Sequence, residues 1–250
     1  MNYNIYTPEK SKDTTVIITH GIAEYSKSYI DLANHLKANG FTVFTYDLRG
    51  HGKSEGKKGY VESYLDFIND LHYLISEVKT TKVFLYGHSM GGIITNIYAR
   101  MYNDFDGIII QASPTTYLKE LGAFKIIPRF LTNNFKVKTD FNDKRLMHNN
   151  NYIKDEYDID YFYFKMVSEV MFKGMKVLVT NRENYNKPIL MIYSKADQMT
   201  NIDLAKKCFS ELKSKDKTFF ELENSYHNIH LDIEKELMLF EVTNWLNERV

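Results

Sequence analysis

The sequence predicts an α/β fold in which helices flank a mostly parallel central sheet. Short apolar runs alternate with amphipathic stretches, the pattern expected of strands and helices wound into one sheet. The chain has 250 residues, of which 44% are hydrophobic and 26% charged, so it is long and apolar enough to bury a large core. The alternation breaks once, after residue 114, where we expect an inserted helical cap.

Six short apolar runs are the expected core strands, at residues 15–19, 41–46, 82–87, 107–111, 189–193 and 218–222. Between them, apolar residues recur at spacings of three and four, which is typical of a helix with one buried face. The expected helices cover residues 32–38, 61–78, 93–101, 204–212 and 233–246.

The segment after Pro114 departs from this pattern. About seventy residues pass before the next strand begins near Pro188, too many for a loop without structure of its own. We therefore expect residues 115–186 to form a helical cap, and residues 1–114 and 187–250 to form the core. Most of the cap's apolar side chains should fill a core of its own, and a few should line a pocket. The richest apolar stretch contains Tyr161, Phe162, Tyr163, Phe164, Met166, Val170, Met171, Phe172 and Met175.

A strand at residues 82–88 is expected to run straight into Ser89 and then into an apolar helix. Gly87, Ser89 and Gly91 form the pattern Gly-x-Ser-x-Gly, a turn so tight that larger flanking side chains would collide with backbone. Such a nucleophile elbow exposes the serine hydroxyl. It also directs the first backbone N–H groups of the helix toward any negative charge that forms there. Ser89 is therefore the candidate nucleophile.

A serine hydroxyl needs a base to take its proton and a carboxylate to orient that base. In this kind of sheet the order is serine, acid, histidine, each on a loop after a strand. Asp197 follows the strand expected at 189–193 and His227 follows the strand expected at 218–222, so both should meet Ser89. Asp197 has an alternative reading as a turn former or helix cap. His230 is the rival of His227, and its alternative role is to pack or cap the next helix.

Two backbone N–H groups are the expected donors to the negative oxygen of a tetrahedral intermediate. One belongs to Met90, directly after the nucleophile. The other belongs to Ile22, in the loop after the strand at 15–19, where Gly21 lets the backbone pass close to the site. We assign His20, in the same loop, a structural role.

Other motifs point to no cofactor. Residues 50–54 read Gly-His-Gly-Lys-Ser, like the end of a phosphate-binding loop, but Asp47 stands where the first glycine is required, which excludes nucleotide binding. We expect Asp47 and Arg49 to hold this loop by hydrogen bonds. His227 and His230 spell His-x-x-His, but no third ligand is evident, so we predict no metal site. The sequence indicates no partner for four other histidines: His35, His72, His88 and His148.

Charge and cysteine content narrow the class of protein further. Thirty-two basic and thirty-two acidic residues cancel, without a basic stripe, so we expect no nucleic-acid partner. The lone cysteine, Cys208, cannot form an internal disulfide and is assigned a packing role. The first ten residues lack the basic start and apolar run of a signal peptide, and no apolar run is long enough to cross a bilayer. We therefore expect a cytoplasmic protein.

Several segments are distinctive when found together: His20-Gly21, Asp47-Leu48-Arg49-Gly50-His51-Gly52-Lys53-Ser54-Glu55-Gly56, Gly87-His88-Ser89-Met90-Gly91-Gly92, Asp197 and Ser225-Tyr226-His227. With them, essentially the whole chain resembles the α/β-hydrolase superfamily, and more narrowly its monoacylglycerol lipase and lysophospholipase branch. The resemblance implies an α/β-hydrolase fold of about eight strands, a helical cap over the site and hydrolysis of acyl esters without a cofactor. Carried over by position, it makes Ser89 the nucleophile, Asp197 and His227 the rest of a triad, and Ile22 and Met90 the oxyanion donors.

Two departures from the family stand out. Only residues 3–6 are available for a strand before the first core strand, so the edge of the sheet should be shortened. The loop that usually reads Gly-x-x-Asp reads Ser194-Lys195-Ala196-Asp197 here.

The expected function is hydrolysis of fatty-acid esters, of a monoacylglycerol or a lysophospholipid, through an acyl-enzyme. One alternative is a short-chain carboxylesterase or thioesterase with a smaller pocket. A second alternative is a non-catalytic ligand-binding homologue. A peptidase is a weaker alternative. An aminopeptidase needs buried carboxylates to bind the substrate's ammonium group, and the only candidates are Glu169 and Asp160 in the expected cap. The partner is a small acyl ester, with transient membrane contact through the cap; the oligomeric state stays open.

Overall fold

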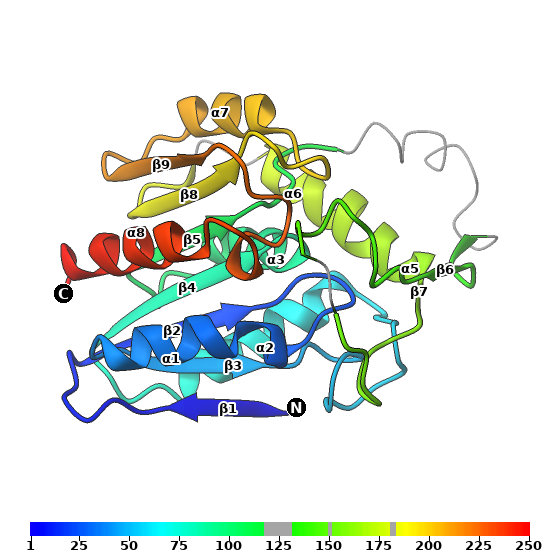
Figure 1. Cartoon of the computed structure of the whole chain (residues 1–250), viewed down its shortest axis with the longest axis horizontal. Helices are drawn as coiled ribbons and strands as arrows, with labels where there is room; N and C mark the ends of the chain where they lie inside the picture. The colour runs from blue at the N-terminus through cyan, green and yellow to red at the C-terminus, as the bar shows by residue number, and fades with distance from the viewer. Residues whose placement is uncertain (118–131, 150–151, 181–183) are drawn as a thin grey trace.

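The computed structural model describes residues 1–117, 132–149, 152–180 and 184–250. Its main sheet has seven strands in the order β1-β3-β2-β4-β5-β8-β9 (Figure 1). Neighbouring strands are parallel, except that β1 is antiparallel to β3. The strands are β1 (Tyr3–Tyr6), β2 (Thr14–Thr19), β3 (Thr42–Tyr46), β4 (Lys82–His88), β5 (Gly107–Gln111), β8 (Ile189–Ser194) and β9 (Lys217–Leu222). The predicted α/β class is confirmed.

Each of the six predicted core strands is present within one residue of its expected bounds. The described sheet has seven strands rather than the eight or so that the family resemblance implied. Only β1 precedes β2, and it forms one edge of the sheet, in line with the shortened edge expected from residues 3–6.

Helices cover both faces of the sheet, as predicted. Buried residues of α1 and α8 form one apolar cluster with one face of the sheet, and those of α2, α3 and α7 belong to a second cluster on the other face. In Figure 1, α1 and α8 lie in front of the sheet. Their bounds are α1 (Ile30–Ala38), α2 (Tyr64–Ser76), α3 (Met90–Met101), α7 (Ile202–Glu211) and α8 (Lys235–Asn247).

Capping explains where α2 begins. The apolar pattern predicted a helix from residue 61, but α2 starts three residues later, after Ser63. The Ser63 hydroxyl accepts a hydrogen bond from Leu65 N–H at 3.2 Å, and the Asp66 carboxylate accepts one from Ser63 N–H at 3.0 Å. This reciprocal pair satisfies N–H groups that have no partner within the helix, so the helix starts where it can be capped.

The connection between β5 and β8 contains both helices and strands in the part that the structure describes. The pair β6 (Lys136–Lys138) and β7 (Tyr161–Tyr163) is a two-stranded antiparallel sheet that the sequence analysis did not predict. It is followed by α5 (Phe164–Val167), a π-helical segment (Ser168–Gly174) and α6 (Met175–Thr180). Residues 118–131, 150–151 and 181–183 of the expected cap lie outside the described residues.

Most of the apolar side chains singled out in this connection pack into the main core rather than into a separate one, contrary to expectation. Phe164, Met166, Val170, Met171, Phe172 and Met175 belong to the same buried cluster as α2 and α3. The π-helical segment lies so close to α3 that a Cβ atom on Gly174 would come 2.7 Å from the Ile97 side chain. These elements therefore extend the main core.

In Figure 1 the core strands other than β1 point to the right, and β6, β7 and α5 lie beyond their carboxyl ends. Ligands of open α/β sheets bind outside the carboxyl ends of the strands, so this is the edge at which to look for a site. None of the described helices combines the length and the apolar character that a membrane span would need.

Candidate active site

Ser89 lies at the turn between β4 and α3 in a strained backbone conformation, with φ of 50° and ψ of −118°. A residue with a side chain rarely adopts such angles, and they persist only where the surroundings enforce them. A Cβ atom on Gly87 would lie 2.5 Å from the carbonyl oxygen of Gly91, and one on Gly91 would collide with the carbonyl oxygen of Thr19. The glycines predicted from the motif therefore permit the turn.

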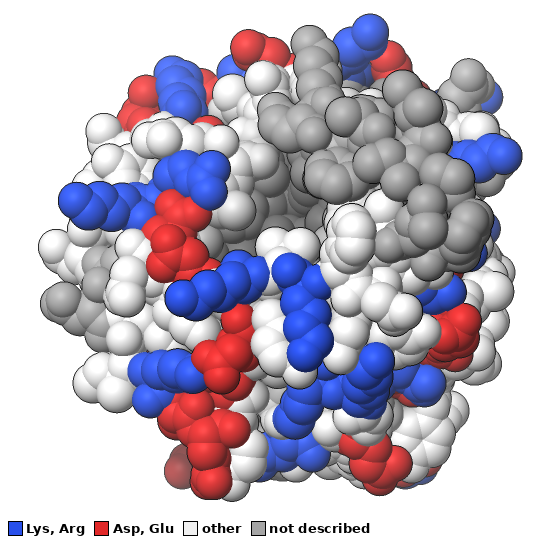
Figure 2. Space-filling model, turned by 90° about the vertical axis from the view of Figure 1, so that its right-hand side faces the viewer, with Lys and Arg blue, Asp and Glu red and all other residues white. Residues whose placement is uncertain are grey.

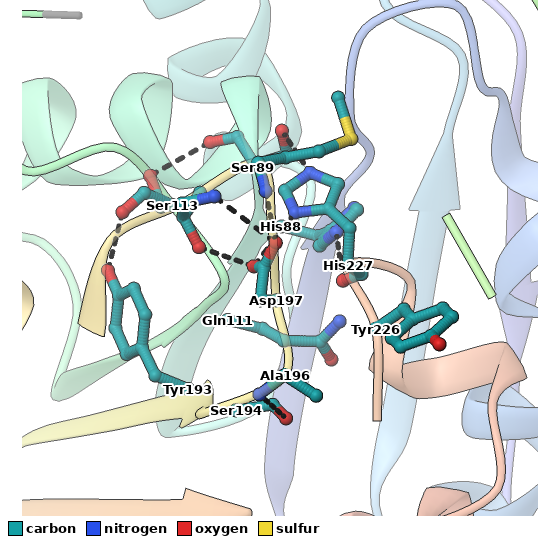
Figure 3. A network of polar contacts seen from close by, with 12 residues as sticks. His88, Ser89, Gln111, Ser113, Tyr193, Ser194, Ala196, Asp197, Tyr226 and His227 are labelled. Atoms are coloured by element: carbon teal, nitrogen blue, oxygen red, sulfur yellow. Dashed lines mark hydrogen bonds and ion pairs between the residues drawn. The ribbon is translucent and has the colours of Figure 1, made fainter. Parts of the chain in front are cut away.

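The structure brings Ser89, His227 and Asp197 together (Figure 3). The Ser89 Oγ atom lies 3.0 Å from His227 Nε2, and His227 Nδ1 lies 3.0 Å from Asp197 Oδ2. Because a carboxylate only accepts hydrogen bonds, the Nδ1–H group donates to Asp197, which leaves Nε2 of a neutral ring to accept the serine proton. His227, rather than His230, contacts the serine.

Asp197 is buried and ionised. Burial alone would raise the pKa of its carboxyl, but its hydrogen bonds and its electrostatic interaction with His227 outweigh burial and lower it. The same carboxylate accepts hydrogen bonds from Met199 N–H at 2.7 Å and Thr200 N–H at 3.1 Å. Asp197 thus bonds to its own turn, as its reading as a turn former predicts, and the same carboxylate contacts His227 Nδ1. The N-cap of α7 is Asn201.

The first part of the His227 loop is held by two carboxylates from the start of α8 and the turn before it. Glu234 accepts hydrogen bonds from the N–H groups of residues 223, 224 and 225, at 3.3, 2.9 and 2.6 Å. Asp232 accepts one from Tyr226 N–H at 2.6 Å. Four consecutive N–H groups before His227 therefore bond to side chains that the sequence analysis did not single out.

The two expected oxyanion donors lie next to Ser89. Met90 is the first residue of α3, whose early N–H groups have no partner within the helix. Ile22 lines the cleft beside Ser89. The backbone approaches closely here, since a Cβ atom on Gly21 would lie 3.4 Å from that of Ser89 and 2.7 Å from a carboxylate oxygen of Glu24. Within the described residues, neither N–H group donates a backbone hydrogen bond.

A buried polar cluster lies behind the site. Glu24 accepts hydrogen bonds from Gly21 N–H at 2.9 Å and the Tyr29 hydroxyl at 2.7 Å, and it pairs with His88 Nδ1 at 3.1 Å. His88 Nε2 lies 3.3 Å from the carbonyl oxygen of His227. His230 stacks on Tyr29 and contacts the Gln111 amide at 3.0 Å. The cluster therefore connects the Ile22 loop to the His227 loop.

This cluster also bears on metal binding. Glu24, His88 and His230 each offer a ligand atom, and these atoms lie within 4.8 Å of one another. This group does not include His227, so it is distinct from the His-x-x-His pair of His227 and His230 considered in the sequence. Burial would raise the pKa of Glu24, but the adjacent histidines and Tyr29 lower it well below its usual range, and burial lowers the pKa of His230 to about 3. Hydrogen bonds engage Glu24 Oε2 and His88 Nδ1, whereas the buried Glu24 Oε1 and His230 Nε2 atoms, 3.7 Å apart, have no hydrogen-bond partner among the described residues.

The four histidines for which the sequence indicated no partner all have one. His88 pairs with Glu24, as described above. The other contacts are those of His35 Nε2 with Thr243 Oγ1 at 3.0 Å, His72 Nδ1 with the Tyr98 hydroxyl at 2.9 Å, and His148 Nδ1 with Asp232 Oδ2 at 3.0 Å. Each partner is distant in the sequence, which is why no local pattern indicated it.

A cleft of about 280 Å³ opens over Ser89 and His227. The connection between β5 and β8 supplies much of its wall, which mixes apolar with charged side chains. Its lining from this connection is Lys138, Thr139, Asp140, Phe141, Asp143, Arg145, Leu146, Met147, Tyr152 and Phe162. Of the aromatic and methionine residues singled out in the sequence, only Phe162 is among them. On this side of the molecule, positive and negative side chains are interspersed (Figure 2).

The two carboxylates considered for a peptidase do not line the cleft. Glu169 is buried and pairs with Lys165 at 3.6 Å and with Lys173. Asp160 pairs with Lys154 near the surface. Both charges are therefore compensated by lysines.

Asp47 and Arg49 both hold the loop after β3 by hydrogen bonds, as predicted, but with different partners. Asp47 accepts hydrogen bonds from Lys53 N–H at 2.8 Å and Ser26 N–H at 2.9 Å, so it closes its own loop and ties it to the Ile22 side. Arg49, in contrast, forms a bidentate pair with Asp70 of α2 at 2.6 and 2.7 Å. Arg49 therefore fastens the loop to a helix rather than to itself.

Comparisons with known proteins agree with this geometry. A family model described as serine aminopeptidase, S33, matches residues 10–234. The monoglyceride lipase of Rattus norvegicus is 28% identical over 265 residues, covering 98% of this chain and 86% of that protein. An uncharacterized abhydrolase domain-containing protein of Dictyostelium discoideum is 25% identical over the whole chain, which spans only 28% of that relative's length. The crystal structure of Paleococcus ferrophilus monoacylglycerol lipase superposes with a TM-score of 0.88 at 26% identity, covering all of both chains.

Proposed function

Because this chain belongs to the serine aminopeptidase, S33, family of α/β-hydrolases, in the branch of the monoglyceride lipases, we propose that it is a carboxylic ester hydrolase. Its substrates are esters of fatty acids, a monoacylglycerol or a lysophospholipid. The single observation that carries the proposal is the hydrogen-bonded series Ser89, His227 and Asp197, with both distances at 3.0 Å.

The reaction has two acyl-transfer steps. Ser89 Oγ attacks the ester carbonyl carbon while His227 Nε2 takes the hydroxyl proton, and the carbon–oxygen bond to the alcohol breaks as His227 returns that proton to the leaving oxygen. Water then attacks the acyl-enzyme, with His227 again as base, and the fatty acid leaves as Ser89 regains its proton. Asp197 stays ionised throughout, holds the ring in the required tautomer and stabilises its protonated form.

The N–H groups of Ile22 and Met90 serve as the oxyanion hole. The strained turn at Ser89 presents the hydroxyl beside both of them, and removal of one such donor typically costs a factor of about 100 to 1,000 in rate. Their support is positional: one follows the nucleophile directly, and the other lines the same cleft.

We further propose that residues 115–186 act as a cap that selects the acyl group. The support is that its described residues supply apolar side chains to the cleft wall, namely Phe141, Leu146, Met147 and Phe162. Residues 1–114 and 187–250 provide the sheet, the nucleophile, the acid and the base. A change of the substrate's acyl chain should therefore change KM more than it changes the rate of acyl transfer to Ser89.

A fluorophosphonate probe tests the catalytic proposal, because it labels only activated serines. Labelling that is lost in Ser89→Ala, together with hydrolysis of monoacylglycerol or lysophospholipid, supports it. Failure of the folded wild-type protein to react would instead favour a non-catalytic ligand-binding homologue. A panel of acetyl to oleoyl esters and a thioester decides substrate class: preference for acetyl or for the thioester would favour the short-chain esterase or thioesterase alternative.

We also propose a cytoplasmic protein that contacts membranes transiently through the cap side. The lone Cys208 supports the first point. The second is supported by exposed apolar side chains of the connection, Phe135 and Ile153. Cell fractionation tests the location, and co-sedimentation with phosphatidylcholine vesicles tests the contact; a protein that is exported, or that never sediments with vesicles, would refute the respective point.

A further inference from the structure

The loop that holds His227 is supported on one side by the connection between β5 and β8. The N–H group of His227 donates a hydrogen bond to the carbonyl oxygen of Arg145 at 3.2 Å, and that of Asn228 donates to the carbonyl oxygen of Leu146 at 2.7 Å. These bonds continue the series of N–H groups that Glu234 and Asp232 accept. Six consecutive N–H groups, at residues 223–228, thus have identified acceptors.

The segment that supplies these two carbonyl groups is fastened by His148. The backbone N–H of His148 donates to Asp232 Oδ1 at 2.9 Å, and its ring Nδ1 lies 3.0 Å from Asp232 Oδ2. The ring also stacks on Tyr226, with centroids 3.8 Å apart and planes inclined by 18°. His148 is therefore bound through its backbone, through its donor nitrogen and through its face.

Asp232 is the point at which the two segments join. Its side chain is 1% exposed and accepts hydrogen bonds both from His148 and from Tyr226 N–H, the residue before His227. Burial would raise the pKa of this carboxyl, but the N–H donors and His148 outweigh burial and lower it, so the acceptor is ionised. Hydrogen bonds to a charged acceptor are stronger and more directional than neutral ones. Loss of the His148 ring would therefore loosen the segment at its anchor.

We propose that His148 is a positioning residue for the base, which fixes the Arg145 and Leu146 carbonyl groups against the His227 loop through its bond to Asp232. This inference rests on the proposed function, since it concerns the placement of His227 for proton transfer. His148 does not touch the reacting atoms. The segment it anchors also lines the cleft through Arg145, Leu146 and Met147, so the wall that contacts substrate and the support of the base are one piece of chain.

Two amide substitutions of His148 separate positioning from simple folding. In His148→Asn the side-chain NH₂ group falls near the place of ring Nδ1 and can still donate to Asp232. In His148→Gln the NH₂ group falls near the place of Nε2, farther from the carboxylate. Both are polar and similar in character, so they differ chiefly in the bond under test. His72→Ala is the control. His72 Nδ1 lies 3.3 Å from Asp104 Oδ2 in a half-exposed pair that is not part of the site.

The measurement is steady-state hydrolysis of p-nitrophenyl butyrate, with the rate of fluorophosphonate labelling and the melting temperature. We expect kcat to fall about ten- to a hundred-fold in His148→Gln and His148→Ala, as small displacements of a catalytic group do. KM should change less than about two-fold, His148→Asn should retain most of the activity, and His72→Ala should match the wild type.

Three outcomes overturn the inference. They are a wild-type kcat in His148→Gln, equal losses in the Asn and Gln variants, or losses of activity that follow only the folded fraction. If His148→Ala fails to fold, the Asn and Gln pair still decides. Failure of the proposed function is seen separately, as a wild-type protein that neither hydrolyses esters nor reacts with the probe.

Discussion

The two loops that meet at the site are held by different means. The turn at Ser89 is set locally: glycines on either side admit the backbone, and the serine itself adopts a φ of 50°. The loop of residues 223–228 has no such constraint, and its N–H groups bond to the carboxylates of Glu234 and Asp232 and to carbonyl groups of the connection between β5 and β8. Besides these glycines, the nucleophile has two bonds to the end of β5, from Ser89 N–H to the Gln111 carbonyl oxygen at 3.0 Å and from the Ser113 hydroxyl to the Ser89 carbonyl oxygen at 2.8 Å. The base, in contrast, has no local constraint of this kind and depends on contacts from α8 and from the connection between β5 and β8.

The largest expected effect on activity is at the Ser89 turn. Ser89→Ala removes the nucleophile but leaves the turn, so ester turnover should fall by roughly a million-fold. The melting temperature should stay within a few degrees of the wild type, since the glycines still admit the turn. Assays with p-nitrophenyl butyrate and thermal unfolding measure the two quantities. Residual turnover near the wild-type level would show that another group performs the chemistry.

Asp197→Asn tests the partner of the base. The amide can offer N–H to His227 Nδ1, which favours the tautomer with its proton on Nε2, where it no longer accepts from Ser89. We expect kcat to fall by about ten-thousand-fold with little change in KM. Asp203→Asn, at an exposed carboxylate in the first turn of α7, is the matched control and should behave as the wild type. A modest loss in Asp197→Asn would mean that another carboxylate orients His227.

Glu234→Gln tests how the distant contacts hold the base. Burial would raise the pKa of Glu234, but the three N–H donors of its neighbours lower it. Because the pKa of Glu234 is lower in the folded state, the carboxylate stabilises the fold at any pH above its ordinary pKa of 4.5. This stabilisation is lost as the pH falls from that value through the pKa of the folded state. We expect the variant to lose about 1 kcal/mol of unfolding free energy at pH 7, because partial exposure weakens the bonds.

The urea unfolding free energy of Glu234→Gln should also fall less steeply than that of the wild type as the pH drops from about 5 to 3. Glu236→Gln is the matched control. Glu236 is exposed and lies two residues after Glu234 on α8, and its substitution removes the same charge. It should leave both the stability at pH 7 and the acid slope nearly unchanged. Identical slopes in the wild type and Glu234→Gln would contradict the role of this carboxylate.

The smallest effect is expected in the cleft wall. Phe162→Ala should raise KM for lauroyl esters about three- to ten-fold by removing apolar contact area, with little effect on acetyl esters. Phe135→Ala removes a ring of the same size that is 55% exposed and outside the cleft lining, so its KM values should match the wild type. An equal change for both chain lengths in Phe162→Ala would indicate a general loosening of the site.

The sequence was sufficient for the core because its signals are local. Each core strand is a short apolar run bounded by turns. The turn at Ser89 is predicted from three residues of fixed spacing, Gly87, Ser89 and Gly91. Asp197 and His227 could be selected because each follows an expected strand at the same edge of the sheet. Their contact with Ser89 then follows from the parallel order of the strands, without knowledge of side-chain packing.

The contacts that hold the base could not be found in this way. Glu234 and Asp232 look like ordinary acidic residues before a helix, and only the folded loop brings N–H groups to them. β6 has three exposed residues, Lys-Val-Lys, too few for a strand pattern, and its partner β7 is more than twenty residues away. The partners of His88 and His148 are likewise distant, so no spacing in the sequence marks them.

The hydrogen bonds that the Arg145 and Leu146 carbonyl groups accept from His227 and Asn228 have a consequence for engineering. Exchanging the segment between β5 and β8 for that of a relative is an obvious route to new substrate preference, because this segment lines the cleft. In this protein such a graft would also replace the backbone on which His227 rests. A chimera should therefore retain residues 143–149 and exchange only the parts of the segment around them. It keeps the carbonyl groups that bond to the His227 loop, and it is the design to build first.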